Sequence, residues 1–168
     1  VASGAELTVT AFDLIKLPFQ DKIDQIINEA GLRFVPDYKY AGGEYDIVLD
    51  CGARSLAIPG LRITKGIVEL TRTGAEVFQR ENLAVPCVSV DDSKLKNFEC
   101  IYGTGEAFLR AFKNLSGQDP TKKKFVVFGF GKIGLGATNA LRAYTEEIIV
   151  VEADKKRIEA AKEAGFEA

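Results

Sequence analysis

Apolar and polar positions alternate in two different ways along the first half of the chain. Residues 6–12 alternate with a period of two, which is typical of a half-buried strand. Residues 21–31 place Ile23, Ile26 and Ile27 on one helical face and end in glycine, which predicts a helix with a glycine stop. Short apolar runs predict further strands at residues 32–38, 45–52, 66–71 and 85–90.

The second half opens with one long helical pattern, SKLKNFECIYGTGEAFLRAFKNL, over residues 93–115. Gly103-Thr104-Gly105 interrupts it, so we expect a break or a close backbone contact there. The remainder predicts strands at residues 125–128 and 148–152 and helices at residues 133–143 and 155–164. Strands that alternate with helices predict an α/β fold with Rossmann-like, doubly wound parallel sheets, in two sub-domains joined by the long helix.

Glycines follow the strand at 125–128 in the spacing Gly129-x-Gly131-x-x-Gly134 and lead into a helix. In a dinucleotide fold the first glycine permits a tight turn, the second lets the backbone approach a pyrophosphate, and the third lets helix and strand pack closely. The helix N-terminus, with Lys132 and Ile133, then offers N–H groups and a positive dipole end to the anion. The turn therefore predicts cofactor binding, with a Gly-rich turn that binds nothing as the alternative.

Glu152 ends the next strand, about 20 residues past the third glycine, where dinucleotide folds place the ribose acid. A carboxylate there accepts hydrogen bonds from ribose hydroxyls and repels a 2′-phosphate, which favours NAD over NADP. The run Lys155-Lys156-Arg157 works against this preference, because a cation can bind a phosphate. S-adenosylmethionine also fits, since an acid at this strand end suits any ribose.

Composition narrows the function classes. The net charge of −2 argues against a nucleic-acid partner, which usually meets a basic face. No apolar run reaches the ~18 residues of a membrane span, so no membrane partner is expected. Three cysteines without C-x-x-C spacing, and the absence of His, predict neither a metal site nor a disulfide framework and are typical of a reducing cytoplasm. The absence of Met predicts a processed chain or a fragment.

Two segments carry a family resemblance. VSVDDSKLKNFECIYGTGEAFLRAFKNL, followed by VVFGFGKIGLGATNALRAY, resembles S-adenosylhomocysteine hydrolase (adenosylhomocysteinase). In that family an Asn-Asp-Ser segment leads into Tyr-Gly, a helix and a Gly-Tyr-Gly-x-Val-Gly-x-Gly cofactor turn. YDIVLDCGAR and GIVELTRTG resemble its Leu-Asp-Asp-Gly-Gly-Asp and Gly-Ile-Ser-Glu-Glu-Thr-Thr-Thr-Gly segments. The resemblance implies a partial substrate-type α/β domain at residues 1–96 and a partial NAD-binding Rossmann domain at residues 97–168.

The resemblance also implies a chemistry, in which bound NAD oxidises the 3′-hydroxyl of a nucleoside so that homocysteine can be eliminated and water added. The three turn glycines and Glu152 match the family's cofactor residues. Thr71 and Thr73 match two of its three threonines near the nicotinamide ribose, and Arg72 replaces the middle one.

The catalytic positions match poorly. Cys51 and Arg54 stand where the family has Asp, and Leu70 stands where it has the Glu that holds adenosine hydroxyls. Leu70 cannot accept a hydrogen bond, which costs binding and discrimination. We therefore expect an inefficient hydrolase.

A lysine–carboxylate pair can still do acid–base work when burial and neighbours tune it. Lys96, with Glu99 or Asp92, is accordingly the candidate catalytic set, with Lys94 as a competing register because this segment is one residue shorter than in the family. The alternatives are a solvated Lys96 and an Asp92 that only caps a helix.

Three hypotheses follow. The chain is an NAD-binding, adenosylhomocysteinase-like enzyme for a small nucleoside, with altered catalytic positions; or a non-catalytic regulatory homologue that binds NAD or an adenosine nucleotide; or an NAD-dependent dehydrogenase on a related frame. A homo-oligomer is compatible with each.

Overall fold

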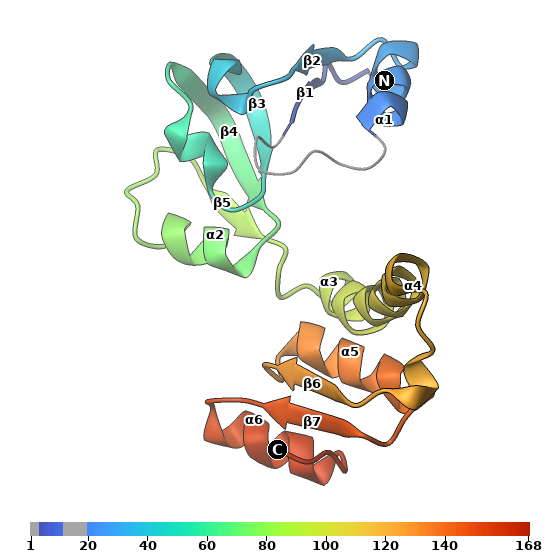
Figure 1. The fold of residues 1–168 in the computed structure, drawn as a ribbon. Helices are drawn as coiled ribbons and strands as arrows, with labels where there is room; N and C mark the ends of the chain where they lie inside the picture. Colours follow the sequence, from blue (N-terminus) through green and yellow to red (C-terminus); the bar gives the residue numbers. More distant parts are fainter. Residues whose placement is uncertain (1–3, 12–19) are drawn as a thin grey trace. The chain divides into compact units, whose positions relative to one another are not determined.

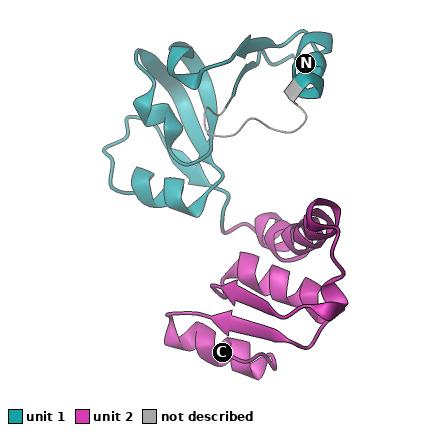
Figure 2. Cartoon of the chain, viewed as in Figure 1, with its two compact units in different colours: residues 1–91 teal, residues 92–168 magenta. Residues whose placement is uncertain are grey.

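The computed structural model describes residues 4–11 and 20–168 (Figure 1). The chain separates into two compact units, residues 1–91 and 92–168 (Figure 2). The sequence predicted this division after residue 96, within the long helical segment that the structure assigns to unit 2. Among the helices of the described ranges, none combines the length and the apolar character that a membrane crossing needs.

Unit 1 contains two small parallel sheets. One pairs β1 with β2, and the other has the order β3-β4-β5. Each strand predicted in this half is present. The elements are β1 (Thr8–Thr10), α1 (Gln20–Glu29), β2 (Arg33–Val35), η1 (Tyr38–Tyr40), β3 (Gly43–Asp50), η2 (Arg54–Ala57), β4 (Leu61–Glu69), α2 (Arg72–Phe78) and β5 (Cys87–Ser89).

The helix α2 was not predicted, and it closes the core of unit 1. Its last residue, Phe78, is 4% exposed and packs in one cluster with Ile67 of β4 and with Ala53. Thr71 begins the helix by accepting a hydrogen bond from the Gly74 N–H. An N-cap threonine is a local signal for the start of a helix. Hydrophobic periodicity did not reveal α2 because the helix is short and has few apolar residues.

Unit 2 is a parallel strand–helix–strand–helix unit behind a helical segment. β6 pairs in register with β7, and Glu167 adds an isolated parallel bridge to Ile149 of β7. The elements are α3 (Lys94–Phe98), η3 (Glu99–Gly103), α4 (Thr104–Ser116), η4 (Pro120–Lys122), β6 (Phe125–Phe128), α5 (Lys132–Arg142), β7 (Ile148–Val151) and α6 (Lys155–Glu163).

One face of the β6–β7 sheet holds the core of unit 2. Ile148 and Val150 are buried there in a cluster with Leu141 of α5 and Ala161 of α6, and both of these helical residues are fully buried. Side chains alternate between the faces of a strand. The opposite positions include Phe128, which is 80% exposed. The parallel, Rossmann-like α/β fold predicted from the sequence is confirmed.

The long helical segment does not break at its glycines. α3 passes into a π-helical turn, η3, and then into α4. The predicted close contact is present instead: a β-carbon on Gly105 would lie 2.9 Å from the Gly136 carbonyl carbon, and one on Gly136 would lie 2.7 Å from the Cys100 carbonyl oxygen. The backbones of the helical segment and α5 therefore touch, which only glycine permits.

Candidate functional site

The turn after β6 is shaped by two glycines that nothing else could replace. Gly129 has a φ of +92°, in the region that favours glycine, and its N–H donates to the Val151 carbonyl at 2.7 Å. A β-carbon on Gly134 would overlap the Gly129 carbonyl oxygen and lie 2.8 Å from the carbonyl carbon. The start of α5 is thus held directly against the end of β6.

The N-terminus of α5 fits an anion. Gly131 is its N-cap residue and supplies no side-chain cap. The first N–H groups of a helix lie beyond the reach of its own i→i−4 hydrogen bonds, and in α5 these groups belong to Lys132, Ile133 and Gly134. They point out of the helix start together with the positive end of its dipole. This cradle has the form that binds a pyrophosphate.

Glu152 lies at the carboxyl end of β7, and its carboxylate links this strand end to the glycine turn after β6. Its Oε2 accepts a hydrogen bond of 2.7 Å from the Phe130 N–H inside the glycine turn. Its Oε1 accepts from the N–H groups of Ala153 at 2.8 Å and Asp154 at 3.1 Å. These bonds, the one from Phe130 first, lower the pKa of Glu152 to about 2, so the carboxylate is ionised at neutral pH.

The Glu152 side chain is only 9% exposed, and its carboxylate retains one acceptor position. An ionised carboxylate offers about four acceptor positions, and backbone N–H groups take three of them. Arg157 Nη1 lies 3.8 Å from Oε2, which is an ion pair but beyond a normal hydrogen-bond length. The remaining position can accept one ribose hydroxyl.

A comparison with protein-family models matches residues 125–168 to the TrkA-N domain. This is a Rossmann-like NAD(P)-binding domain. The matched stretch begins at β6 and includes the glycine turn and Glu152. This part of the chain is therefore an NAD(P)-binding Rossmann-type domain, and the predicted cofactor class is confirmed at the level of NAD(P).

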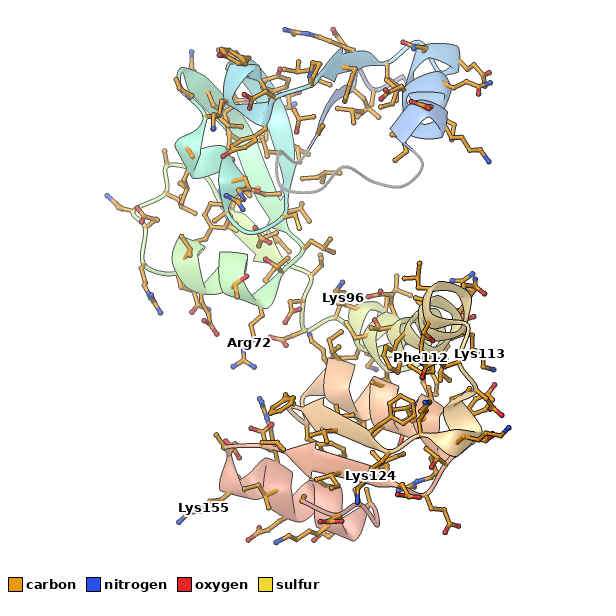
Figure 3. All side chains as sticks on the ribbon, viewed as in Figure 1. Arg72, Lys96, Phe112, Lys113, Lys124 and Lys155 are labelled. Atoms are coloured by element: carbon orange, nitrogen blue, oxygen red, sulfur yellow. The ribbon has the colours of Figure 1, made fainter. Side chains whose placement is uncertain are left out.

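A second cluster of titratable groups in unit 2 lies on the helical segment. Lys96 Nζ is 3.0 Å from Glu99 Oε2, and Lys96 (labelled in Figure 3) is only 23% exposed. The thiol of Cys100 donates to the same Glu99 oxygen at 3.5 Å. The hydrogen bond from Lys96 is the main cause that lowers the pKa of Glu99, and Lys132 adds to it through its charge. The structure thus brings Lys96 and Glu99 together near the first residue of α5.

The other members of this cluster differ in character. Cys100 is 2% exposed and burial raises its thiol pKa, as expected of a small buried hydrophobic residue. Asp92 is exposed in the turn that precedes α3. Its catalytic role stays a prediction.

Two buried carboxylates organise the loop that joins β3 to η2 in unit 1. Asp50, at the end of β3, accepts from the N–H groups of Cys51, Arg54 and Ser55 at 2.7–2.9 Å. Glu69, fully buried at the end of β4, accepts from Gly52 and Ala53 at 3.0 Å. Asp50 therefore ends β3 and accepts hydrogen bonds from the first N–H groups of η2.

Glu69 also holds Thr71, a predicted cofactor residue. The Thr71 hydroxyl donates to Glu69 Oε1 at 2.7 Å and accepts from the Gly74 N–H at 3.0 Å. The Thr73 hydroxyl lies 3.4 Å from that of Thr71. Both threonines belong to unit 1, and their binding to a nicotinamide ribose stays a prediction.

Unit 1 also contains a cavity of about 400 Å³ between β1 and β3. Cys51 and Arg54 line it, so two of the three residues that the resemblance aligned with acids meet at one cavity. Within the described part of the chain, the Tyr45 hydroxyl and the Ser55 hydroxyl are buried beside it without a hydrogen-bond partner. Leu70, the third replacement, is 43% exposed.

Sequence reasoning missed two contacts that give the site its form. One is the bond from the Phe130 N–H to Glu152, whose partners lie 22 residues apart in the chain. The other is made by Gly105, where the sequence predicted a close backbone contact but not its partner, Gly136 of α5. The fourth glycine of GFGKIGLG, Gly136, was the available signal for this second contact.

Proposed function

We propose that unit 2 binds NAD, with the pyrophosphate on the N-terminus of α5 and the adenosine ribose on Glu152. The hydrogen bond between the Phe130 N–H and Glu152 carries this proposal, because it sets the ribose acid beside the phosphate cradle. The ionised carboxylate can accept from a ribose hydroxyl and disfavours a 2′-phosphate, which is the basis for preferring NAD. Lys132, at the first position of α5, adds a positive charge beside the phosphates.

Retention of a nucleotide by the purified protein is the direct test. The protein is denatured, and the supernatant is analysed by mass spectrometry; the same protein, stripped of nucleotide, is titrated with NAD by calorimetry. We expect NAD in the supernatant and saturable binding to the stripped chain. Gly134→Ala serves as the matched negative variant, because its β-carbon overlaps the Gly129 carbonyl. Equal binding by this variant, or no binding of any adenine nucleotide by the wild-type chain, contradicts the proposal.

We further propose that the whole chain is an adenosylhomocysteinase-like protein with reduced or lost hydrolase activity. The support is the sequence resemblance together with Cys51, Arg54 and Leu70 at positions where that family has acids. Neither a thiol nor a leucine side chain replaces a carboxylate as acceptor for ribose hydroxyls. The Lys96–Glu99 pair, at 3.0 Å, is the observation that favours residual acid–base activity on a nucleoside.

Activity is measured with S-adenosylhomocysteine and NAD, following adenosine release by chromatography and the absorbance of NADH. We expect slow release of adenosine. Lys96→Met should lower this rate further, whereas Lys94→Met should not, because the Lys94 side chain is exposed. Turnover comparable to ordinary members of the family would refute the proposed loss. Absence of any redox change in bound NAD would favour the regulatory homologue, and NADH accumulating in solution would favour a dehydrogenase.

A further inference from the structure

Arg157 reaches from α6 to the ribose end of the nucleotide cradle. Its Nη1 lies 3.8 Å from Glu152 Oε2, and a β-carbon placed on Gly131 would lie 3.7 Å from the same nitrogen. The guanidinium therefore borders both the acid at the end of β7 and the glycine turn. In a dinucleotide fold the 2′-position of the adenosine ribose lies next to this acid.

The two lysines that precede Arg157 are placed differently. Lys155 and Lys156 are exposed, and Lys155 points away from the strands into solvent (Figure 3). Asp154 caps α6 by accepting from the N–H groups of Lys156 and Arg157, which fixes the first turn of the helix and the root of the Arg157 side chain. Within this basic run, the structure thus brings one residue, Arg157, to the cradle.

We propose that Arg157 sets how strongly this site discriminates NAD from NADP, by offering its guanidinium to a 2′-phosphate that Glu152 alone would repel. The inference rests on the proposed function, since it needs the ribose to lie on Glu152. The distance of 3.8 Å exceeds a hydrogen bond, so the guanidinium is not locked onto the carboxylate. Its planar fork matches a phosphate in two places, whereas a lysine provides a single charge.

The preference between NAD and NADP depends on the opposite charges of Glu152 and Arg157. Glu152 faces it from the end of β7, and its low pKa keeps it anionic. Asp154 lies at the start of the same helix but is engaged with backbone N–H groups. With Arg157 present, a 2′-phosphate meets one anion and one cation; without it, the phosphate meets the anion alone. NADP binding should therefore depend on Arg157 much more than NAD binding does.

Calorimetric titration of the full chain with NAD, NADP, 5′-AMP and adenosine 2′,5′-bisphosphate tests this inference. Arg157→Gln should lower the affinity for NADP and for the bisphosphate about tenfold or more, which is the scale of one charge-assisted hydrogen bond. The same variant should lower the affinity for NAD and for AMP less than about threefold. Lys156 is the exposed neighbour of Arg157, so Lys156→Gln is the matched control and should leave the affinity for all four nucleotides unchanged. Arg157→Lys retains the charge without the fork and should lie between wild type and Arg157→Gln.

The outcomes separate this inference from the proposed function. Equal weakening of NAD and NADP by Arg157→Gln, or no change in either, overturns the role of Arg157 while leaving nucleotide binding intact. A wild-type chain that binds none of the four nucleotides refutes the proposed function, and the inference with it.

Discussion

Two glycines in one helical segment should respond oppositely to the same substitution. Gly105 and Gly103 are both followed and preceded by helical backbone, yet their surroundings differ. A β-carbon on Gly105 would lie 2.9 Å from the Gly136 carbonyl carbon and 3.0 Å from Ala140 Cβ, whereas one on Gly103 would meet only Glu99 Cγ at 3.9 Å. The first is an overlap with backbone, and the second is an ordinary contact.

The two effects can be given magnitudes. Alanine is favoured over glycine in a helix by about 1 kcal/mol, which both variants gain. Overpacking costs typically about 1–3 kcal/mol and occasionally more, and the backbone of α5 cannot rotate away as a side chain could. Gly103→Ala should therefore stabilise unit 2 by up to about 1 kcal/mol. An overlap with backbone places Gly105→Ala in the upper part of that range, at about 2–3 kcal/mol, so after the propensity gain it should destabilise unit 2 by about 1–2 kcal/mol.

Hydrogen exchange followed by mass spectrometry can distinguish the effects of the two variants on stability in the full chain, since it reports opening segment by segment. Exchange of α5 amides should accelerate about 5–30-fold in Gly105→Ala, the factor for 1–2 kcal/mol, and should slow or stay constant in Gly103→Ala. Peptides from β3 and β4, in unit 1, are the internal control. If both variants slow exchange in α5 alike, the close contact between Gly105 and Gly136 is refuted.

Three further outcomes are expected. Gly134→Ala should lose nucleotide binding by calorimetry while retaining its circular dichroism spectrum, since its β-carbon overlaps the Gly129 carbonyl; unchanged affinity would contradict the cradle. Glu152 has a pKa of about 2, so NAD affinity should show no loss from its protonation between about pH 4 and pH 8, and a fall centred near its ordinary pKa of about 4.3 would contradict the hydrogen bonds assigned to it. Glu69 is fully buried, which raises its pKa, but hydrogen bonds from Gly52, Thr71 and Ala53 outweigh the burial and lower the pKa. The ionised carboxylate therefore stabilises unit 1 above about pH 4.3, and this stabilisation is lost as the pH falls through the lowered pKa. Glu69→Gln should remove that acid dependence in urea unfolding and cost about 1–3 kcal/mol at neutral pH for a buried donor left without an acceptor; an unchanged midpoint would contradict this.

The elements of unit 2 were predictable because their signals are local. The apolar run before Gly129, the glycine spacing and the acid at the end of β7 each lie within one short segment, and the strands and helices found match those predicted. The same holds for most strands of unit 1. The helix α2 escaped because it is short and carries few apolar residues, so the cap at Thr71 was its main sign.

The sequence by itself determined the fold class, the glycine turn and the identity of Glu152, since backbone freedom and periodicity are properties of neighbouring residues. Only the tertiary structure decided how these parts meet. It joined Glu152 to the Phe130 N–H, set Arg157 rather than Lys155 beside the cradle, and packed Gly105 against Gly136 and Ala140 of α5. Contacts between residues far apart in the chain leave no period in the sequence, because each partner is chosen by the fold and not by its neighbours.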